Sequence, residues 1–66
     1  MPKKYRGEAT GNDAMDALHG ALKKAWEDAK SDGKHGKELR VESWHVKGQN
    51  PINWSSIVLI DDNDPS

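Results

Sequence analysis

The residue types that most often perform catalysis are present in this chain but are not arranged for it. The histidines His19, His35 and His45 are widely spaced, and the chain contains no cysteine. Because a zinc site needs three or four ligands at defined spacing, we expect no metal site. The serines near the predicted strands do not lie in a GxSxG turn, so no activated nucleophile is indicated. The sequence therefore predicts no catalytic residues and a protein that is not an enzyme.

Three tryptophans and no phenylalanine make an unusual set of aromatic residues. Trp26 continues the apolar stripe of a predicted helix, which favours a place in the core or at an interface. Trp44 and Trp54 have matching parity in neighbouring strand-like segments, where they could pack on each other, anchor a subunit contact or stack a flat ligand. The residues that we predict at a ligand site or interface are Trp44, His45, Val46, Trp54 and Val58. Within this set, His45 would make the contact sensitive to pH.

A second group of candidate residues is basic and lies near the N-terminus and in a glycine-containing loop. The possible contacts to an anion or to nucleic acid are Lys3, Lys4, Arg6, Lys34 and Lys37. Ten basic residues against eleven acidic ones give a net charge of −1, whereas nucleic-acid-binding domains usually carry a clustered excess of positive charge. A nucleic-acid-associated protein is therefore the alternative hypothesis, and a protein or small-ligand partner the leading one.

An amphipathic helix is the clearest element in the middle of the chain. Its apolar residues recur at steps of three and four: Met15, Leu18, Leu22, Ala25 and Ala29. Polar residues before this stripe and Gly33 after it supply a start and a stop, so the pattern predicts a helix over residues 12–32. Gly20 should cost this helix about 1 kcal/mol relative to alanine. Close backbone approach by another element would explain why glycine is present there, and so would neutral drift.

Alternating segments on both sides of the helix predict three strands. Residues 5–9 alternate small and charged side chains, which is typical of an edge strand or of a place where another element packs closely. Residues 38–47 and 52–60 also alternate, and the short turn between them predicts an antiparallel hairpin. The parity of the apolar residues changes between Ser43 and Trp44. This change indicates either a β-bulge or a switch of the buried face.

These elements predict a single α+β domain over residues 1–60, in the order β-α-β-β, with one helix packed on a three-stranded antiparallel sheet. Residues 61–66 are acidic and lack apolar side chains, which predicts a disordered tail. One face of the sheet is expected to carry Trp44, Val46, Trp54, Val58 and Ile60, and the other Leu39, Val41, Ile57 and Leu59. Because one helix covers only one face, we expect a second copy of the chain or a ligand to cover the other.

Hydropathy and the N-terminal residues bear on location. No apolar run approaches the roughly 20 residues that a membrane-spanning helix needs. No apolar stretch follows the N-terminal lysines, as a signal peptide would require. We therefore expect a cytoplasmic protein with no membrane partner.

The order of a polar strand, a helix and a hairpin of two longer strands, from Tyr5 to Ile60 and without disulfides, resembles the dodecins. Dodecins are small β-α-β-β proteins whose sheet wraps part of the helix, and their subunits assemble into a hollow shell that in many members stores flavin. The resemblance implies a homo-oligomer and a flavin ligand, although the residues themselves predict no cofactor. The dodecin flavin stacks on a tryptophan near the start of the second strand, whereas here that segment reads Leu39-Arg40-Val41 and Trp44 lies further along. We therefore predict a non-enzymatic, self-associating module that binds a protein or a small flat ligand.

Overall fold

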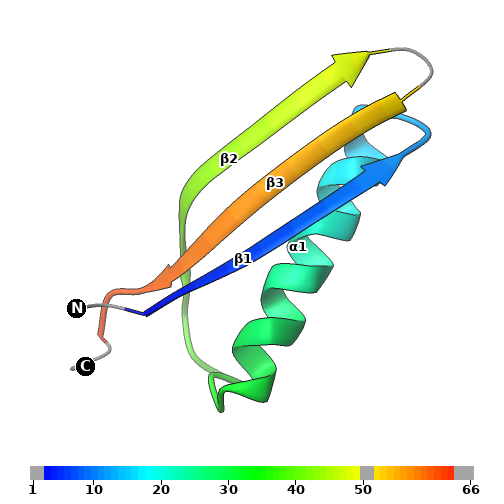
Figure 1. Cartoon of the computed structure of the whole chain (residues 1–66). Coiled ribbons are helices and arrows are strands. Elements are labelled where there is room, and N and C mark those ends of the chain that lie inside the picture. The colour runs from blue at the N-terminus through cyan, green and yellow to red at the C-terminus, as the bar shows by residue number, and fades with distance from the viewer. Residues whose placement is uncertain (1–2, 50–51, 64–66) are drawn as a thin grey trace.

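The computed structural model describes residues 3–49 and 52–63. Its elements are β1 (Lys3–Gly11), α1 (Ala14–Ser31), β2 (Arg40–Gln49) and β3 (Ile52–Asp61), in the order drawn in Figure 1. The α+β fold, with one helix on a three-stranded antiparallel sheet, is confirmed. The helix lies within two residues of both predicted ends.

β3 is the central strand of the sheet, and its neighbours on both sides run antiparallel to it. The predicted hairpin of β2 and β3 is confirmed, with Gln49 opposite Ile52. The predicted edge position of the first strand is also confirmed, since β1 pairs only with β3, from Lys3 opposite Asp61 to Gly11 opposite Asn53.

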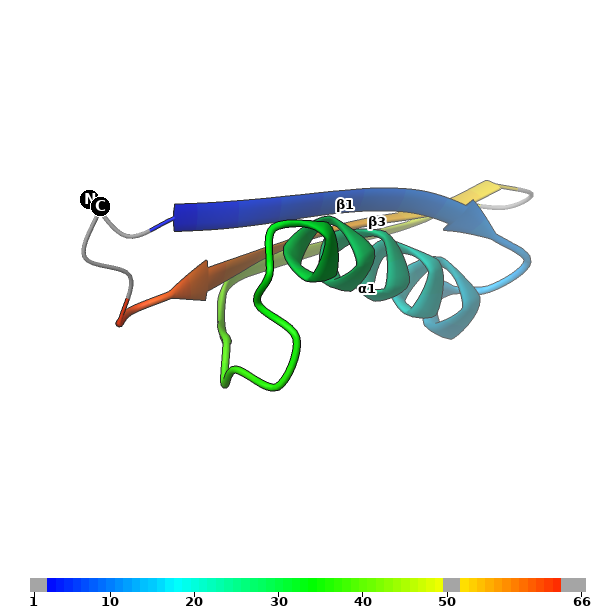
Figure 2. The same cartoon turned by 90° about the horizontal axis from the view of Figure 1, so that it is seen from below.

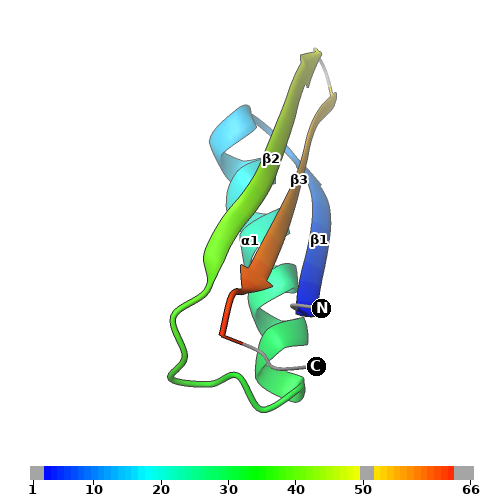
Figure 3. The same ribbon diagram turned by 90° about the vertical axis from the view of Figure 1, so that its left-hand side faces the viewer.

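The helix packs on one face of the sheet, chiefly against β1 and β3, and reaches β2 only marginally (Figure 2). We call this face the helix side and the other face the open side. The end of β2 and the start of β3 extend past the N-terminal end of α1, as Figure 3 shows. The helix therefore leaves part of the helix side uncovered, mostly along β2.

Small residues bring α1 and β1 unusually close together. The helix residues that face the sheet are fully buried alanines: Ala17, Ala21, Ala25 and Ala29. A Cβ atom built on Gly7 would lie 2.0 Å from the carbonyl oxygen of Ala21, so only glycine fits there. A Cβ atom on Gly20 would lie 2.8 Å from the Cβ atom of Ala9, which confirms that close approach accounts for the glycine inside the helix.

An aspartate caps each end of α1, and the expected glycine follows the C-terminal cap. The side chain of Asp13 accepts a hydrogen bond of 2.8 Å from the amide of Asp16, which satisfies one of the free amides of the first turn. At the other end, the amide of Asp32 donates to the carbonyl of Ala29. Gly33 then adopts a φ of 79°, a conformation that other residues rarely take, and the helix stops.

A β-bulge interrupts β2, which confirms one of the two interpretations of its parity change. Val41 lies opposite Leu59 and Ser43 opposite Val58, so Glu42 is the extra residue. The bulge thus lies slightly earlier than the parity change indicated. Because of it, Val41, Trp44 and Val46 all lie on the helix side.

The prediction that Trp44 and Trp54 share one face is wrong. Trp44 lies opposite Ile57, on the helix side, whereas Trp54 lies opposite Lys47, on the open side. The reason is the register of the hairpin, in which Gln49 pairs with Ile52. Beyond the bulge, each even-numbered residue of β2 therefore lies opposite an odd-numbered residue of β3. Equal parity in these two strands means opposite faces. Val46 accordingly lies with Trp44, and Val58 and Ile60 lie with Trp54.

The end of β3 differs from the tail that the sequence predicts over residues 61–66. Asp61 is the last residue of β3 and only 4% exposed. The Asp62 carboxylate accepts two hydrogen bonds from Arg40, at 2.8 and 3.0 Å. Residues 64–66 lie outside the described part of the chain. The acidic residues nearest the sheet have fixed partners that composition could not reveal.

Candidate functional site

Three apolar side chains of β2 project on the helix side where α1 does not reach. Val41, Trp44 and Val46 are 47%, 53% and 45% exposed. They lie opposite Leu59, Ile57 and Ser55 of the central strand, all of which are buried. β2 therefore carries an apolar row that the helix leaves uncovered, whereas β1 and β3 lie against the helix.

The helix adds apolar side chains next to this row. Met15, Leu22 and Trp26 lie on one stripe of α1, and Gly20 lies on its opposite flank, against Ala9 of β1. Since β1 is at one edge of the sheet and β2 at the other, the stripe lies on the flank of the helix that is turned toward β2. Met15 is 71% exposed and Leu22 40% exposed. The packing of Trp26 against the core is confirmed, and Trp26 is only partly buried.

We call the set formed by Met15, Leu22, Val41, Trp44 and Val46 the α1–β2 apolar surface. A hollow of about 340 Å³, lined by His19, Leu22, Lys23 and Trp26, adjoins it on the helix. In a chain of which only 33% is hydrophobic, most of the large exposed apolar side chains belong to this surface. Large exposed apolar side chains gathered on one side of a small domain are typical of an interaction site.

The open side holds the other predicted site residues in a mixed polar setting. Its residues form cross-strand rows from β1 through β3 to β2, namely Thr10–Trp54–Lys47, Glu8–Ser56–His45, Arg6–Val58–Ser43 and Lys4–Ile60–Arg40. His45 is exposed, and Trp54 and Val58 are partly buried. The structure therefore divides the predicted ligand or interface residues between the two faces and does not bring them into one site.

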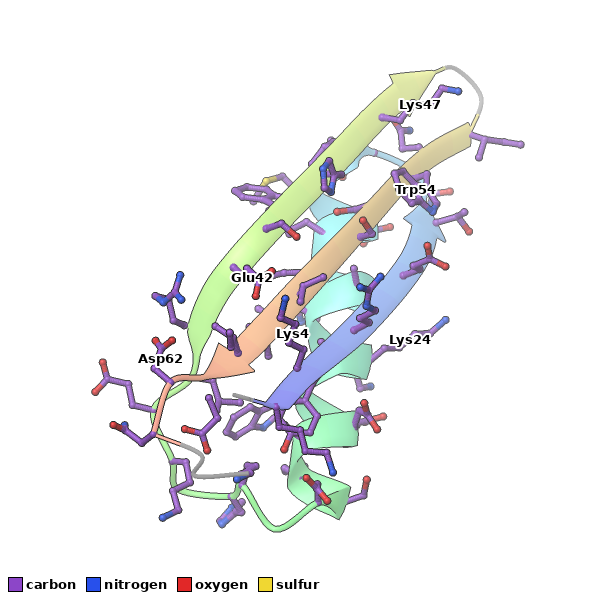
Figure 4. All side chains as sticks on the ribbon, turned by 60° about the vertical axis from the view of Figure 1, so that its left-hand side comes forward. Lys4, Lys24, Glu42, Lys47, Trp54 and Asp62 are labelled. Carbon is purple, nitrogen blue, oxygen red and sulfur yellow. The ribbon has the colours of Figure 1, made fainter. Side chains whose placement is uncertain are left out.

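An ion pair spans the central strand on the open side. The ammonium of Lys4 on β1 lies 2.8 Å from a carboxylate oxygen of Glu42, the bulge residue of β2 (Figure 4). Ile60 of the central strand β3 lies directly opposite Lys4 and is only 6% exposed. Long side chains cover apolar surface with their stems, so the pair provides part of the cover that the sequence assigned to a second copy or ligand.

The basic candidates do not form one patch. Lys3 pairs with Asp32 at 2.9 Å. Lys34 pairs with Asp61 at 3.0 Å, and the side chains of this second pair are only 16% and 6% exposed, respectively. Lys4 is engaged with Glu42. Among residues 3–49 and 52–63, Arg6 and Lys37 have no ion-pair partner, and they lie on the open side of β1 and in the loop before β2. Three of these five cations are therefore engaged in ion pairs within the chain, and only that of Lys34 is shielded from water.

A polar cluster at the C-terminal end of α1 could not be found from the sequence. The hydroxyl of Tyr5 donates a hydrogen bond of 2.6 Å to Asp32, which also pairs with Lys3. The Tyr5 hydrogen bond and, next, that of Lys3 lower the pKa of Asp32 below its ordinary value. Hydrogen bonds from Arg40 likewise lower the pKa of Asp62 and raise that of Arg40. These groups fasten the chain at one end of the sheet.

Two negative findings apply to the part of the chain that the structure describes. No group of three or more histidine, aspartate or glutamate side chains there is placed to hold a metal ion. No helix in residues 3–49 and 52–63 is long and apolar enough to cross a membrane.

Comparison with known proteins gives no relative. No family model, no curated protein and no solved structure matches the chain. The resemblance to the dodecins therefore stays a prediction, and function must be argued from the surfaces described above.

Proposed function

We propose that this protein is a non-enzymatic, self-associating α+β module, and that the α1–β2 apolar surface is where a second copy binds. The observation that carries the proposal is the exposure of Val41, Trp44 and Val46 at 45–53% on a strand whose neighbour is buried on the same face. Chains of this length bury only about 60% of the surface that their unfolded form exposes. Assembly supplies the apolar contacts that one copy lacks.

A second copy of the chain fits this surface without any further partner. In a two-fold symmetric contact the same patch occurs on both sides, so an apolar patch covers itself. The surface also has the composition of an interface core, with one tryptophan, one methionine and aliphatic side chains but no charged residue. A small planar ligand stacked on Trp44 is the competing occupant.

The solution mass of the purified chain tests the proposal. We expect sedimentation or light scattering at micromolar concentration to give a multiple of 7.3 kDa. Val46→Lys should yield a folded monomer, because it places a charge in the contact. The matched control is Ile52→Lys, at a residue 62% exposed outside the α1–β2 apolar surface, which should keep the wild-type mass.

The outcomes separate the alternatives. A folded wild-type monomer at high concentration would refute self-association, and so would a Val46→Lys protein of unchanged mass. The visible absorbance of the same sample reports a bound chromophore. A coloured monomer that loses its colour on Trp44→Ala would identify the surface as a ligand site instead.

A further inference from the structure

The outer edge of β2 has backbone groups directed away from the sheet. The carbonyl of His45 accepts a hydrogen bond of 3.0 Å from the hydroxyl of Ser55 on β3, so it is directed inward. Since backbone groups alternate in direction along a strand, the amide and carbonyl groups of Trp44 and Val46 are directed outward. Within residues 3–49 and 52–63, no strand pairs with this edge.

The two edges of the sheet differ in how well they are protected against pairing. β1 carries charged side chains at Lys3, Lys4, Arg6 and Glu8, and such charges discourage another strand from adding to an edge. From Ser43 to Gly48, by contrast, β2 has lysine only at position 47 and no proline. β2 is thus the edge that can accept another strand.

From these observations we infer that two copies of the chain pair β2 with β2, antiparallel about a two-fold axis at His45, to form a continuous six-stranded sheet. The inference rests on the proposed function and names the geometry of the same contact. In this register Trp44 of each copy lies opposite Val46 of the other, and Ser43 lies opposite Lys47. The outward backbone groups of Trp44 and Val46 then form the hydrogen-bonded pairs, and Ser43 with Lys47 forms a non-hydrogen-bonded pair.

The neighbouring registers are less favourable. Trp44 opposite itself would set Val46 against Glu42, the bulge residue, whose irregular backbone interrupts a ladder. Val46 opposite itself would set His45 against Lys47 and Trp44 against Gly48, which removes the apolar partner of the indole. The axis at His45 gives an aromatic side chain opposite a β-branched one, a pairing that stabilises sheets.

The same pairing brings the α1–β2 apolar surfaces of the two copies side by side. Both helices then lie on one side of the sheet, each under its own β1 and β3, at a separation of about four strand spacings, or ~19 Å. Directly packed helices are only about 8–10 Å apart. The space between them is a groove whose floor is formed by Val41, Trp44 and Val46 of both copies, flanked by Met15 and Leu22.

Single cysteines test this geometry, because the natural chain contains none. A residue on the axis that forms a non-hydrogen-bonded pair with itself has a Cα separation of about 4.5 Å, within the range of a disulfide. We expect His45→Cys to form a covalent dimer with oxidised glutathione, seen on a non-reducing gel. Glu8→Cys is the matched control, since it lies in the same cross-strand row on the β1 edge, and it should stay uncrosslinked.

A second set of variants keeps the test informative if His45→Cys does not fold. Ser43→Cys and Lys47→Cys should each fail to crosslink alone and should crosslink when the two proteins are mixed and equilibrated. An assembled protein in which these variants fail to crosslink, or in which Glu8→Cys crosslinks instead, would overturn the β2 pairing and leave the proposed function intact. A wild-type monomer would overturn both.

Discussion

At the scale of single residues, the missing side chain of Gly7 determines how closely β1 and α1 approach. The position of a Cβ atom on this residue lies 2.0 Å from the Ala21 carbonyl oxygen and 2.5 Å from the Ala25 amide nitrogen. Both are backbone atoms and cannot move aside without moving the helix. The close contact between β1 and α1 is thus possible only because residue 7 has a hydrogen atom in place of a side chain.

We therefore expect Gly7→Ala to lower the free energy of unfolding by about 3 kcal/mol, the upper range for overpacking a core. Urea unfolding followed by circular dichroism measures this change. Gly48→Ala is the matched control in another strand, because a Cβ atom there meets its nearest neighbour, Asn53, at 3.4 Å. Its effect should stay within about 0.5 kcal/mol. Equal stabilities for the two variants would contradict this account of the core.

At the scale of elements, the loop between α1 and β2 is fastened to the end of β3. Lys34 of the loop and Asp61 of the strand form the least exposed ion pair of the described residues. The nearby pair of Arg40 and Asp62 has side chains 58% and 50% exposed. The two pairs differ in exposure, and Arg40 binds its carboxylate through two hydrogen bonds.

Asp61→Asn should destabilise the protein by more than about 1 kcal/mol, because the ion pair that it breaks is largely shielded from water. Asp62→Asn should cost less than about 1 kcal/mol, since exposed ion pairs contribute little. Thermal and urea unfolding of both variants at neutral pH provide the comparison. An Asp61→Asn protein as stable as Asp62→Asn would mean that the loop is held by other contacts.

The elements themselves were accessible from the sequence, because each has a period that local patterns reveal. The helix, the hairpin and the edge position of the first strand follow from the spacing of apolar residues and from the short turn. The faces of β2 were not accessible, because the bulge at Glu42 and the pairing of Gln49 with Ile52 together decide which side Trp44 occupies. Loss of the bulge, or a shift of the hairpin pairing by one residue, would place these side chains on the opposite face of the sheet.

The candidate site was predictable only in part for a related reason. Trp44 and Val46 belong to the α1–β2 apolar surface, as the sequence suggested, whereas Trp54, His45 and Val58 lie on the other face. The ion pair between Lys4 and Glu42 joins residues far apart in the chain and covers apolar surface that the sequence assigned to a partner. Such pairings depend on strand order, which places β3 between β1 and β2.

At the scale of the whole molecule, self-association and stability should be linked. A contact made only by folded chains stabilises them by mass action, so the melting temperature rises with protein concentration. We expect this rise for the wild-type protein over a hundredfold range of concentration, measured by circular dichroism in cells of different path length. The Val46→Lys variant should melt at a temperature that is lower and independent of concentration. A wild-type melting temperature that does not change with concentration would contradict the linkage.

The alanine stripe of α1 has a thermodynamic consequence. Its four buried residues each contribute one methyl group, and the strand residue against them, Gly7, contributes none. The heat capacity change of unfolding grows with the apolar area that becomes hydrated. A core built on close backbone contact exposes little such area, so this change should be small and the stability curve correspondingly flat.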